Sequence, residues 1–249
     1  MRDRVYRTEG VIIRRSDFGE ADRLLTLITP QGKRRVVAKG ARKTTSRLAG
    51  HIELFTHATL LLAVGRSLDI VTQSVILHPY DSLRGDLKRI GAAYYAAELI
   101  DRLLEEDDEN RPAFDLLVAA LAALDSSRNV DLVLRFYELH LLGFLGYRPQ
   151  LYHCAGCQEV LGEDTNRFSP AAGGALCPRC APADRAAIPM SLSAFKLLRF
   201  LQAQPLDAIE RLNISDTTRA EAEKLLRAYI RRILERDLKS VAFLEEISS

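Results

Sequence analysis

The stretch RLLTLITPQGKRRVVA, residues 23–38, has the signature of a β-hairpin. Two runs rich in leucine, threonine and valine flank the turn residues Pro30, Gln31 and Gly32, a pattern typical of a strand, a tight turn and a second strand. Strand-length runs of the same kind occur at residues 5–14, 53–64 and 69–77. Five short strands with one longer loop, residues 40–51, predict a small closed barrel of the OB type. A small antiparallel sandwich is the alternative.

After Pro79 the apolar residues recur with the spacing of amphipathic helices,. Helices are expected at about residues 90–104, 112–124 and 130–145, again after Ser191 or Ser193, and last at about 216–235,. The predicted fold class is therefore α+β with more than one domain. A five-stranded OB-type β-barrel at residues 1–80 is followed by an α-helical domain at residues 81–249.

All four cysteines lie in one interval within the helical part. Cys154 and Cys157 form one Cys-x-x-Cys pair, Cys177 and Cys180 form a second, and nineteen residues separate the pairs. Two tight turns with this spacing can direct four sulfur atoms at one ion, which is the pattern of a zinc site. A disulfide interpretation is weaker, because no cysteine lies outside the cluster.

The predicted metal centre is structural and binds one Zn²⁺. Four thiolates leave no open coordination position for a substrate, whereas a catalytic zinc keeps one. His153 stands beside the first ligand and could replace a cysteine, but four cysteines already suffice, so it is expected to be an ordinary loop residue. We expect a four-cysteine zinc element at about residues 150–184, inserted between helices. With Gly162, Pro170, Gly173 and Gly174 between its cysteine pairs, it cannot build a core of its own.

Length and composition are those of a globular protein. The 249 residues, 47% of them hydrophobic, leave room for two or three small domains,. No apolar run reaches the length of a membrane span, and the polar first nine residues predict no signal peptide,. Cysteines that must stay reduced suit a cytoplasmic protein.

The net charge of +2 conceals a strong asymmetry. Residues 1–80 contain fourteen Lys and Arg against seven Asp and Glu, and no acidic residue occurs from residue 33 to residue 47. Such a cluster binds a polyanion by releasing its counterions, and OB-type barrels hold strands in basic grooves. The predicted DNA-binding residues are Arg14, Arg15, Lys33, Arg34, Arg35, Lys39, Arg42, Lys43, Arg47 and Arg66. A solvated charged face is the competing interpretation.

Several runs of the sequence resemble a known family. They are FGEADRLLT at residues 18–26, VVAKGAR at 36–42, SRLAG at 46–50 and LGFLGYRP at 142–149. Together with the two cysteine pairs, they look like the RecO family of bacterial recombination mediators, in the same order and over most of the chain. The resemblance implies an N-terminal OB domain, a helical domain and, in many members, a four-cysteine zinc element.

The resemblance also implies a function in DNA repair and recombination. Proteins of this family bind single- and double-stranded DNA, anneal complementary strands and work with the partner RecR. Together with RecR they help load the recombinase RecA onto strands coated by the single-stranded-DNA-binding protein, SSB. The resemblance therefore implies a cytoplasmic protein that is nucleoid-associated when it acts on DNA.

A protein partner is expected in the helical half. The acidic C-terminal tail of SSB would suit an apolar groove with a basic rim. The possible rim residues are Lys196, Arg199, Arg227, Arg231 and Arg232. The alternative is that these side chains are ordinary exposed faces of amphipathic helices.

The sequence has no recognisable catalytic set, so no enzymatic activity is expected. It contains neither a Gly-x-x-x-x-Gly-Lys-Ser/Thr loop nor a Gly-x-Ser-x-Gly motif,. Glu20 and Asp22 are spaced as a metal-binding pair, but pairing with nearby arginines is the favoured role. A zinc-ribbon adaptor for protein assembly, with incidental DNA contact, is the second candidate function, and a zinc hydrolase is the third.

Overall fold

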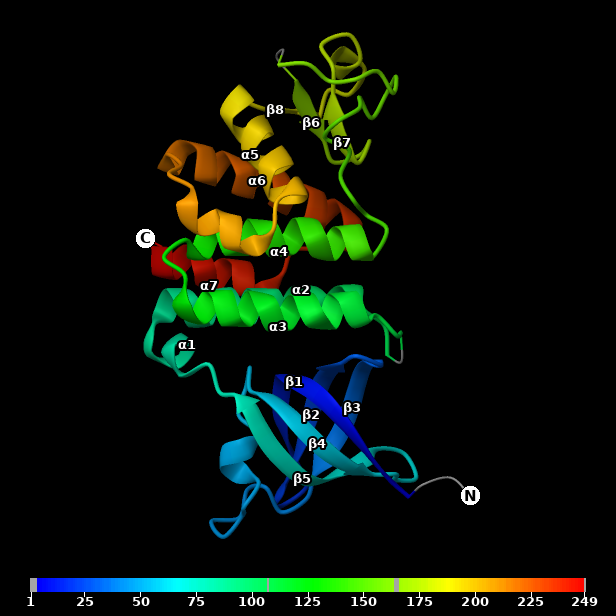
Figure 1. Ribbon diagram of the computed structural model, residues 1–249. Coiled ribbons are helices and arrows are strands. Elements are labelled where there is room, and N and C mark those ends of the chain that lie inside the picture. The colour runs from blue at the N-terminus through cyan, green and yellow to red at the C-terminus, as the bar shows by residue number, and fades with distance from the viewer. Residues whose placement is uncertain (1–3, 107, 164–165, 249) are drawn as a thin grey trace. The chain divides into compact units, whose positions relative to one another are not determined.

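The structure is a computed structural model that describes residues 4–106, 108–163 and 166–248. The chain forms two compact units, one up to Ser126 and one from Ser127 to Ile247. We call the first the barrel unit and the second the helical unit. The predicted order is confirmed: a five-stranded sheet comes first and most of the helices follow (Figure 1). None of the described helices is long and apolar enough to cross a membrane.

The sheet of the barrel unit is closed. Its strands are β1 (Val5–Phe18), β2 (Asp22–Thr29), β3 (Gly32–Ala38), β4 (His57–Ala63) and β5 (Asp69–His78). They follow one another around the barrel in the order β1-β2-β3-β5-β4. Neighbouring strands are antiparallel except β3 and β5, which pair in parallel through Val36 and Val37. The predicted hairpin is β2–β3, and the closed sheet replaces the alternative of a sandwich.

Alternation along the strands fills the interior of the barrel. Leu25 and Leu27 of β2 are fully buried, and so are Ile12 of β1 and Leu60 of β4. Successive side chains of a strand point to opposite faces, so every second residue reaches the core. The sequence therefore determines which face of each strand is turned inward.

Two strand boundaries differ from the sequence-based expectation. β1 continues to Phe18 because its pairing with β2 runs on to Phe18 and Asp22. The strand expected at residues 53–64 begins only at His57. Phe55 has a positive φ of 63°, a left-handed conformation that interrupts an extended strand. The preceding loop contains a short 3₁₀ helix, η1 (Ala49–His51).

Three helices complete the barrel unit: α1 (Asp81–Gly85), α2 (Leu87–Leu103) and α3 (Arg111–Ser126). α2 starts earlier than expected, because the side chain of Asp86 accepts a hydrogen bond from the N–H of Arg89 at 3.0 Å and caps the helix,. The ring of Tyr94 packs edge-on against Phe55, with centroids 4.9 Å apart. These helices thus pack against the barrel, and the compact unit continues beyond residue 80 to Ser126.

The helical unit is built on α4 (Val130–Phe144), α5 (Leu192–Ala203), α6 (Asp216–Leu234) and α7 (Lys239–Ser248), with the 3₁₀ helix η3 (Leu206–Arg211) between α5 and α6. Of the two predicted caps for α5, Ser191 is the one used: its hydroxyl accepts from the N–H of Ala194 at 3.1 Å. The helix expected to be last is followed by α7, which the apolar spacing does not predict.

The cysteine segment lies between α4 and α5, as expected, but it is more ordered than predicted. It forms a three-stranded sheet of β6 (Arg167–Ser169), β7 (Gly174–Leu176) and β8 (Ile188–Pro189), with a 3₁₀ helix, η2 (Ala181–Ala183). Phe168 of β6 is fully buried, and its ring lies 5.9 Å from that of Tyr229 on α6. The segment therefore shares its apolar side with the helical unit.

Candidate metal centre and nucleic-acid interface

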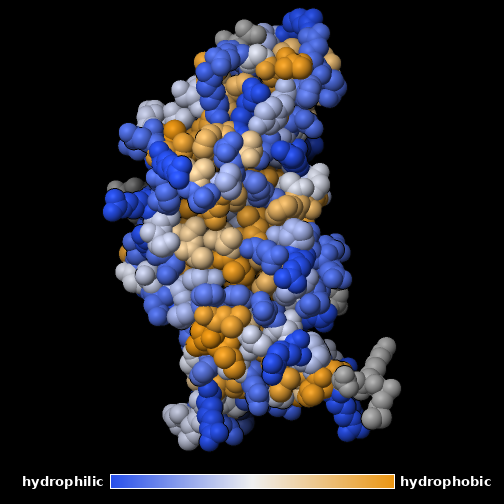
Figure 2. Space-filling view, viewed as in Figure 1, coloured by the Kyte–Doolittle hydropathy of each residue, from blue (hydrophilic) through white to orange (hydrophobic). Residues whose placement is uncertain are grey.

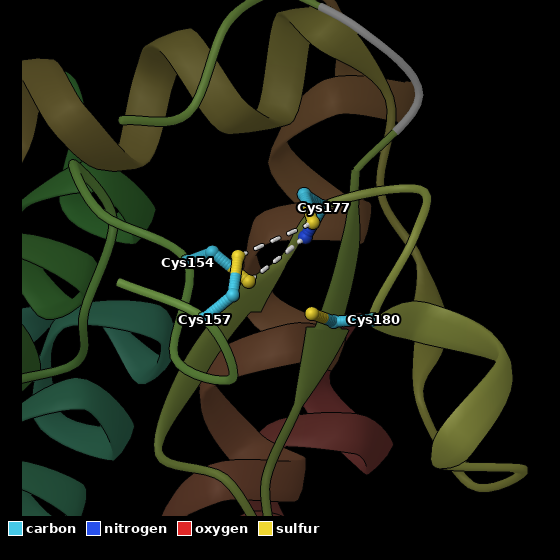
Figure 3. Close-up of side chains that lie close together, drawn as sticks. All are labelled: Cys154, Cys157, Cys177 and Cys180. Carbon is cyan, nitrogen blue, oxygen red and sulfur yellow. Dashed lines mark hydrogen bonds between the residues drawn. The ribbon is translucent and has the colours of Figure 1, made fainter. Parts of the chain in front are cut away.

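The four cysteines converge on one point in the helical unit (Figure 3). Their sulfur atoms all lie within 4.8 Å of one another. The sulfurs of Cys157 and Cys177, one from each pair, are 3.8 Å apart. A regular tetrahedron with Zn–S bonds of about 2.3 Å has edges of about 3.8 Å, so this spacing fits a single zinc ion.

Backbone N–H groups prepare one sulfur for ionisation. The Cys154 sulfur accepts hydrogen bonds from the N–H of Cys177 at 3.3 Å and from that of Gly156 at 3.4 Å. Burial opposes ionisation, but these N–H groups, together with the N–H and the thiol of Cys157, outweigh it and lower the pKa of Cys154 to about 6,. Cys154 is therefore a thiolate at neutral pH.

The neighbouring sulfurs have the opposite effect on Cys180. The pKa of the Cys180 thiol is raised to about 12, because this thiol shares hydrogen bonds with the sulfurs of Cys157 and Cys177 and lies near the Cys154 thiolate. Four thiolates this close repel one another unless a cation lies among them. The donor set therefore fits a divalent, thiophilic ion such as Zn²⁺ and no water-binding position is left in the sulfur shell.

The chain around the cysteines holds the two turns together. An ion pair joins Arg179 of the second turn to Glu159 of the first. A side chain at Gly156 would lie 3.1 Å from the Cys180 sulfur, so this position favours glycine. His153 is exposed, its backbone pairs with Val160, and it lies outside the group of potential ligands found among the described residues. The geometry brings the four cysteines together and leaves His153 outside the cluster.

Metal binding to this centre should weaken as the pH falls. A metal binds thiolates, so thiols that are protonated at neutral pH, such as Cys180, must release their protons,. Below about pH 6 the metal-free Cys154 is protonated too. We therefore expect zinc affinity, measured in competition with a chromogenic chelator, to fall more steeply with pH below about 6. An affinity independent of pH would contradict thiolate ligation, and the exposed change Val160→Ser should leave the titration unaltered.

The predicted DNA-binding residues fall into three groups in the barrel unit. The first is the β3–β4 connection, which contains Lys39, Arg42, Lys43 and Arg47, all exposed. Arg42 bonds back to the β1–β2 turn: it donates to the carbonyl of Glu20 at 3.2 Å and pairs with Asp17 at 3.4 Å. In the part of the chain that the structure describes, the other three form no ion pair. We call Lys39, Lys43 and Arg47 the free-cation loop.

The second group lies on β3, where the three basic residues differ. Lys33 is largely buried, pairs with Asp101 at 3.4 Å and donates to its backbone carbonyl at 2.8 Å. Arg34 pairs in register with the fully buried Leu27 and hydrogen-bonds the hydroxyl of Tyr6. Arg35 is exposed and lies 4.0 Å from Glu106. Only Arg35 of this group is turned to solvent.

The third group comes from β1 and from the β4–β5 loop. Arg14 is exposed and pairs with Asp101 at 3.1 Å, whereas Arg15 pairs with Glu53 at 2.5 Å. Arg14 and Arg15 line a cleft of about 410 Å³ together with Lys33 and Arg35. Arg66 is exposed in the β4–β5 loop and is not among the residues that line this cleft.

The acidic neighbours of these cations were not anticipated. Asp101 and Glu106 line the same cleft, although the sequence places them far from the barrel strands. Asp22 was expected to pair with an arginine, but its carboxylate accepts from the N–H of Gly40 at 2.7 Å. The surface is also not uniformly polar: Val64 and Val75 are exposed, and Figure 2 shows hydrophobic side chains over the barrel.

The possible rim residues of the helical unit separate into two clefts. Arg199 lies over the rings of Tyr152 and Phe195, at 4.3 and 5.0 Å from their centroids, beside Lys196, in a cleft of about 360 Å³. Lys196 pairs with Glu163 at 2.8 Å. A second cleft of about 740 Å³ has an apolar lining from the cysteine segment and contains Arg231 and Arg232. Arg227 lines an adjoining cleft of about 420 Å³ and pairs with Glu245 of α7.

The fold and the two sites together define a class of protein: a basic β-barrel joined to a helical unit that carries a four-cysteine metal centre. Comparison with family models is more specific. The model described as "Recombination protein O N terminal" matches residues 1–80, and "Recombination protein O C terminal" matches residues 84–242. The chain belongs to the recombination protein O family.

Similar curated proteins agree with this assignment. The chain is 66% identical over 247 residues to the DNA repair protein RecO of Roseiflexus sp. (strain RS-1), covering 99% of this chain and 87% of the relative. It is 38% identical over 244 residues to the DNA repair protein RecO of Dehalococcoides mccartyi, covering 98% and 96% of the two chains. The DNA repair protein RecO of Symbiobacterium thermophilum is 36% identical over 249 residues, with 98% of each chain covered.

Proposed function

We propose that this protein is a DNA-binding recombination mediator in DNA repair that binds single- and double-stranded DNA and anneals complementary strands. The observation that carries the proposal is the free-cation loop, Lys39, Lys43 and Arg47, exposed on the barrel of a chain that belongs to the recombination protein O family. Cations without carboxylate partners release counterions in full when they meet phosphates. Membership of the recombination protein O family supports the role in recombination and repair.

The barrel is proposed to be of the OB type and to act as the DNA-binding domain, residues 1–80, beside a helical domain at 81–249. Five strands closed in the order β1-β2-β3-β5-β4 support this reading, as do cations on β3 and in the β4–β5 loop. In OB folds the face of the second and third strands and the β1–β2 and β4–β5 loops contact nucleic acid. Arg35 and Arg66 lie in these regions.

Annealing by such a surface is physical and needs no catalytic residue. Two complementary strands repel each other through their phosphates, and a basic surface lowers that repulsion while it raises the local concentration of both strands. The protein is therefore proposed to act without enzymatic activity. The zinc element, at about residues 150–184, is proposed to hold one structural Zn²⁺ and to stabilise the helical unit.

Family membership and the clefts of the helical unit also support protein partners. We propose that the protein works with RecR, and that the pair helps load RecA onto SSB-coated single-stranded DNA in the cytoplasm, at the nucleoid. The cleft of Arg199 and Lys196 supports a site for the acidic tail of SSB, because aromatic rings line it and two cations border it. The clefts of Arg227, Arg231 and Arg232 are the second possible place for this tail.

The direct test of the proposed function is an annealing assay with the full chain. Two labelled complementary oligonucleotides should pair faster with the protein than without it, and the acceleration should decrease from about 50 to about 200 mM salt. A protein that binds neither single nor double strands at low salt would contradict the proposal. Such a result would leave the zinc-ribbon adaptor as the better interpretation.

A further inference from the structure

Two carboxylates of the barrel unit lie among the cations that line the cleft of Arg14, Arg15, Lys33 and Arg35. Asp101, in the last turn of α2, pairs with Arg14 at 3.1 Å and with Lys33 at 3.4 Å. Glu106, a few residues further on, lies 4.0 Å from Arg35. We call Asp101 and Glu106 the acidic rim of the cleft.

The backbone brings the rim to this place, independently of the ion pairs. β3 pairs with β5 only at Val36 and Val37, so the first half of β3 has an open edge. Lys33 uses that edge for a parallel bridge to Glu106. Gly32 has a φ of +103°, and a side chain there would come within 2.6 Å of the Asp108 carbonyl oxygen. The close approach at Gly32 and the bridge hold Asp108 and Glu106 along β3.

The cations opposite the rim form an outward-facing row across the sheet. Arg14 of β1 pairs in register with Thr26 of β2, which pairs in register with Arg35 of β3. The side chains of Arg14 and Arg35 are 67% and 47% exposed, and that of Glu106 is 57% exposed. A phosphate can therefore reach both arginines, but each already has a carboxylate neighbour.

We infer that the acidic rim is an intramolecular competitor for DNA phosphates, which lowers the affinity of the cleft and leaves the free-cation loop as the stronger contact. Exposed ion pairs are weak, so a DNA phosphate can replace the carboxylate beside an arginine. Breaking the ion pair then costs part of the free energy with which the DNA binds. A cation that is already neutralised also releases fewer counterions, so the rim flattens the salt dependence of binding. The inference rests on the proposed DNA-binding function and concerns the regulation of the same surface.

Glu106→Gln tests the competitor in the full chain, because the change is isosteric and the side chain is exposed. Binding of a fluorescein-labelled oligo-dT, followed by anisotropy, should become about two- to fivefold tighter at about 50 mM salt. The plot of log affinity against log salt should steepen by about 0.7, the contribution of one additional phosphate contact on a single strand. The matched control is Asp115→Asn, which removes the same charge from an exposed residue of α3 that pairs with Arg111 at 3.4 Å.

A double-mutant cycle separates competition from a general charge effect. If Glu106 acts by occupying Arg35, the gain from Glu106→Gln should disappear in an Arg35→Gln background. Equal affinities for Glu106→Gln and Asp115→Asn would overturn the inference, and so would a gain that persists without Arg35. In both cases wild-type binding would still support the proposed function. A wild-type chain that does not bind the oligonucleotide would overturn both.

Discussion

Cys154→Ser should abolish stoichiometric zinc binding and destabilise the helical unit by more than about 3 kcal/mol, because loss of a metal is one of the few mechanisms by which a single substitution exceeds the usual range. Cys154 is the fully buried member of the four, and its sulfur accepts two backbone N–H groups. Serine presents a hard oxygen in place of a thiolate and leaves the other three cysteines as an incomplete shell. Metal content by mass spectrometry and the free energy of unfolding in urea measure the two effects.

The physical reason for so large an effect is the size of the cysteine segment. Its sheet has strands of three, three and two residues, too short to be stable alone. A bound ion would join the turn of Cys154 and Cys157 to the turn of Cys177 and Cys180, and would so hold Phe168 against Tyr229. Without the ion, the entropy of this segment opposes that contact.

The control for this variant is Val160→Ser, an exposed change in the same turn, which should keep the metal and the stability of the parent. DNA affinity of Cys154→Ser should remain within about twofold, because every predicted DNA-binding residue lies in the barrel unit,. A variant that keeps its zinc and its stability, or one that stays folded but loses DNA binding, would refute a purely structural role for the centre.

Changing the free-cation loop to glutamine, as Lys39→Gln, Lys43→Gln and Arg47→Gln together, should weaken DNA binding about 10- to 100-fold at about 50 mM salt. Each cation that contacts a phosphate of single-stranded DNA contributes about 0.7 to the slope of log affinity against log salt, so the slope should fall by about 2. The three side chains are exposed and form no ion pair in the described part of the chain. Their replacement should therefore leave the unfolding temperature of the barrel nearly unchanged.

A matched triple variant removes the same charge from the helical unit. Arg128, Arg185 and Arg236 are exposed there, and their replacement by glutamine should change affinity only through the small effect of net charge, within about twofold. If the loop variant and this control bound DNA equally well, the free-cation loop would not be the principal contact. Arg34→Gln offers a further contrast, because its contact with Tyr6 predicts a loss of stability in place of a loss of salt dependence.

Features that depend on neighbours in the sequence were predictable. The turn at Pro30–Gly32 and the two Cys-x-x-Cys turns involve residues only a few positions apart, so local backbone chemistry decides them. The cap of α5 at Ser191 is equally local and was predicted. The cap of α2 at Asp86 and the helix α7 were not predicted. Arg34 was predictable in the same way. It lies opposite the buried Leu27, and residues paired directly across two strands share a face, so alternation alone turns Arg34 away from solvent,.

Short-range periodicity and spacing are enough to predict the order of the barrel and helical elements, the inward faces of the strands and the cluster of four cysteines. Which cations lack a carboxylate partner depends instead on contacts between residues that are far apart in the chain. Lys33 and Asp101 are 68 positions apart, and no local pattern links Arg14 to that carboxylate or Arg35 to Glu106. The barrel brings them together by burying apolar strand faces, and the resulting ion pairs set how much of the positive charge is left for a phosphate.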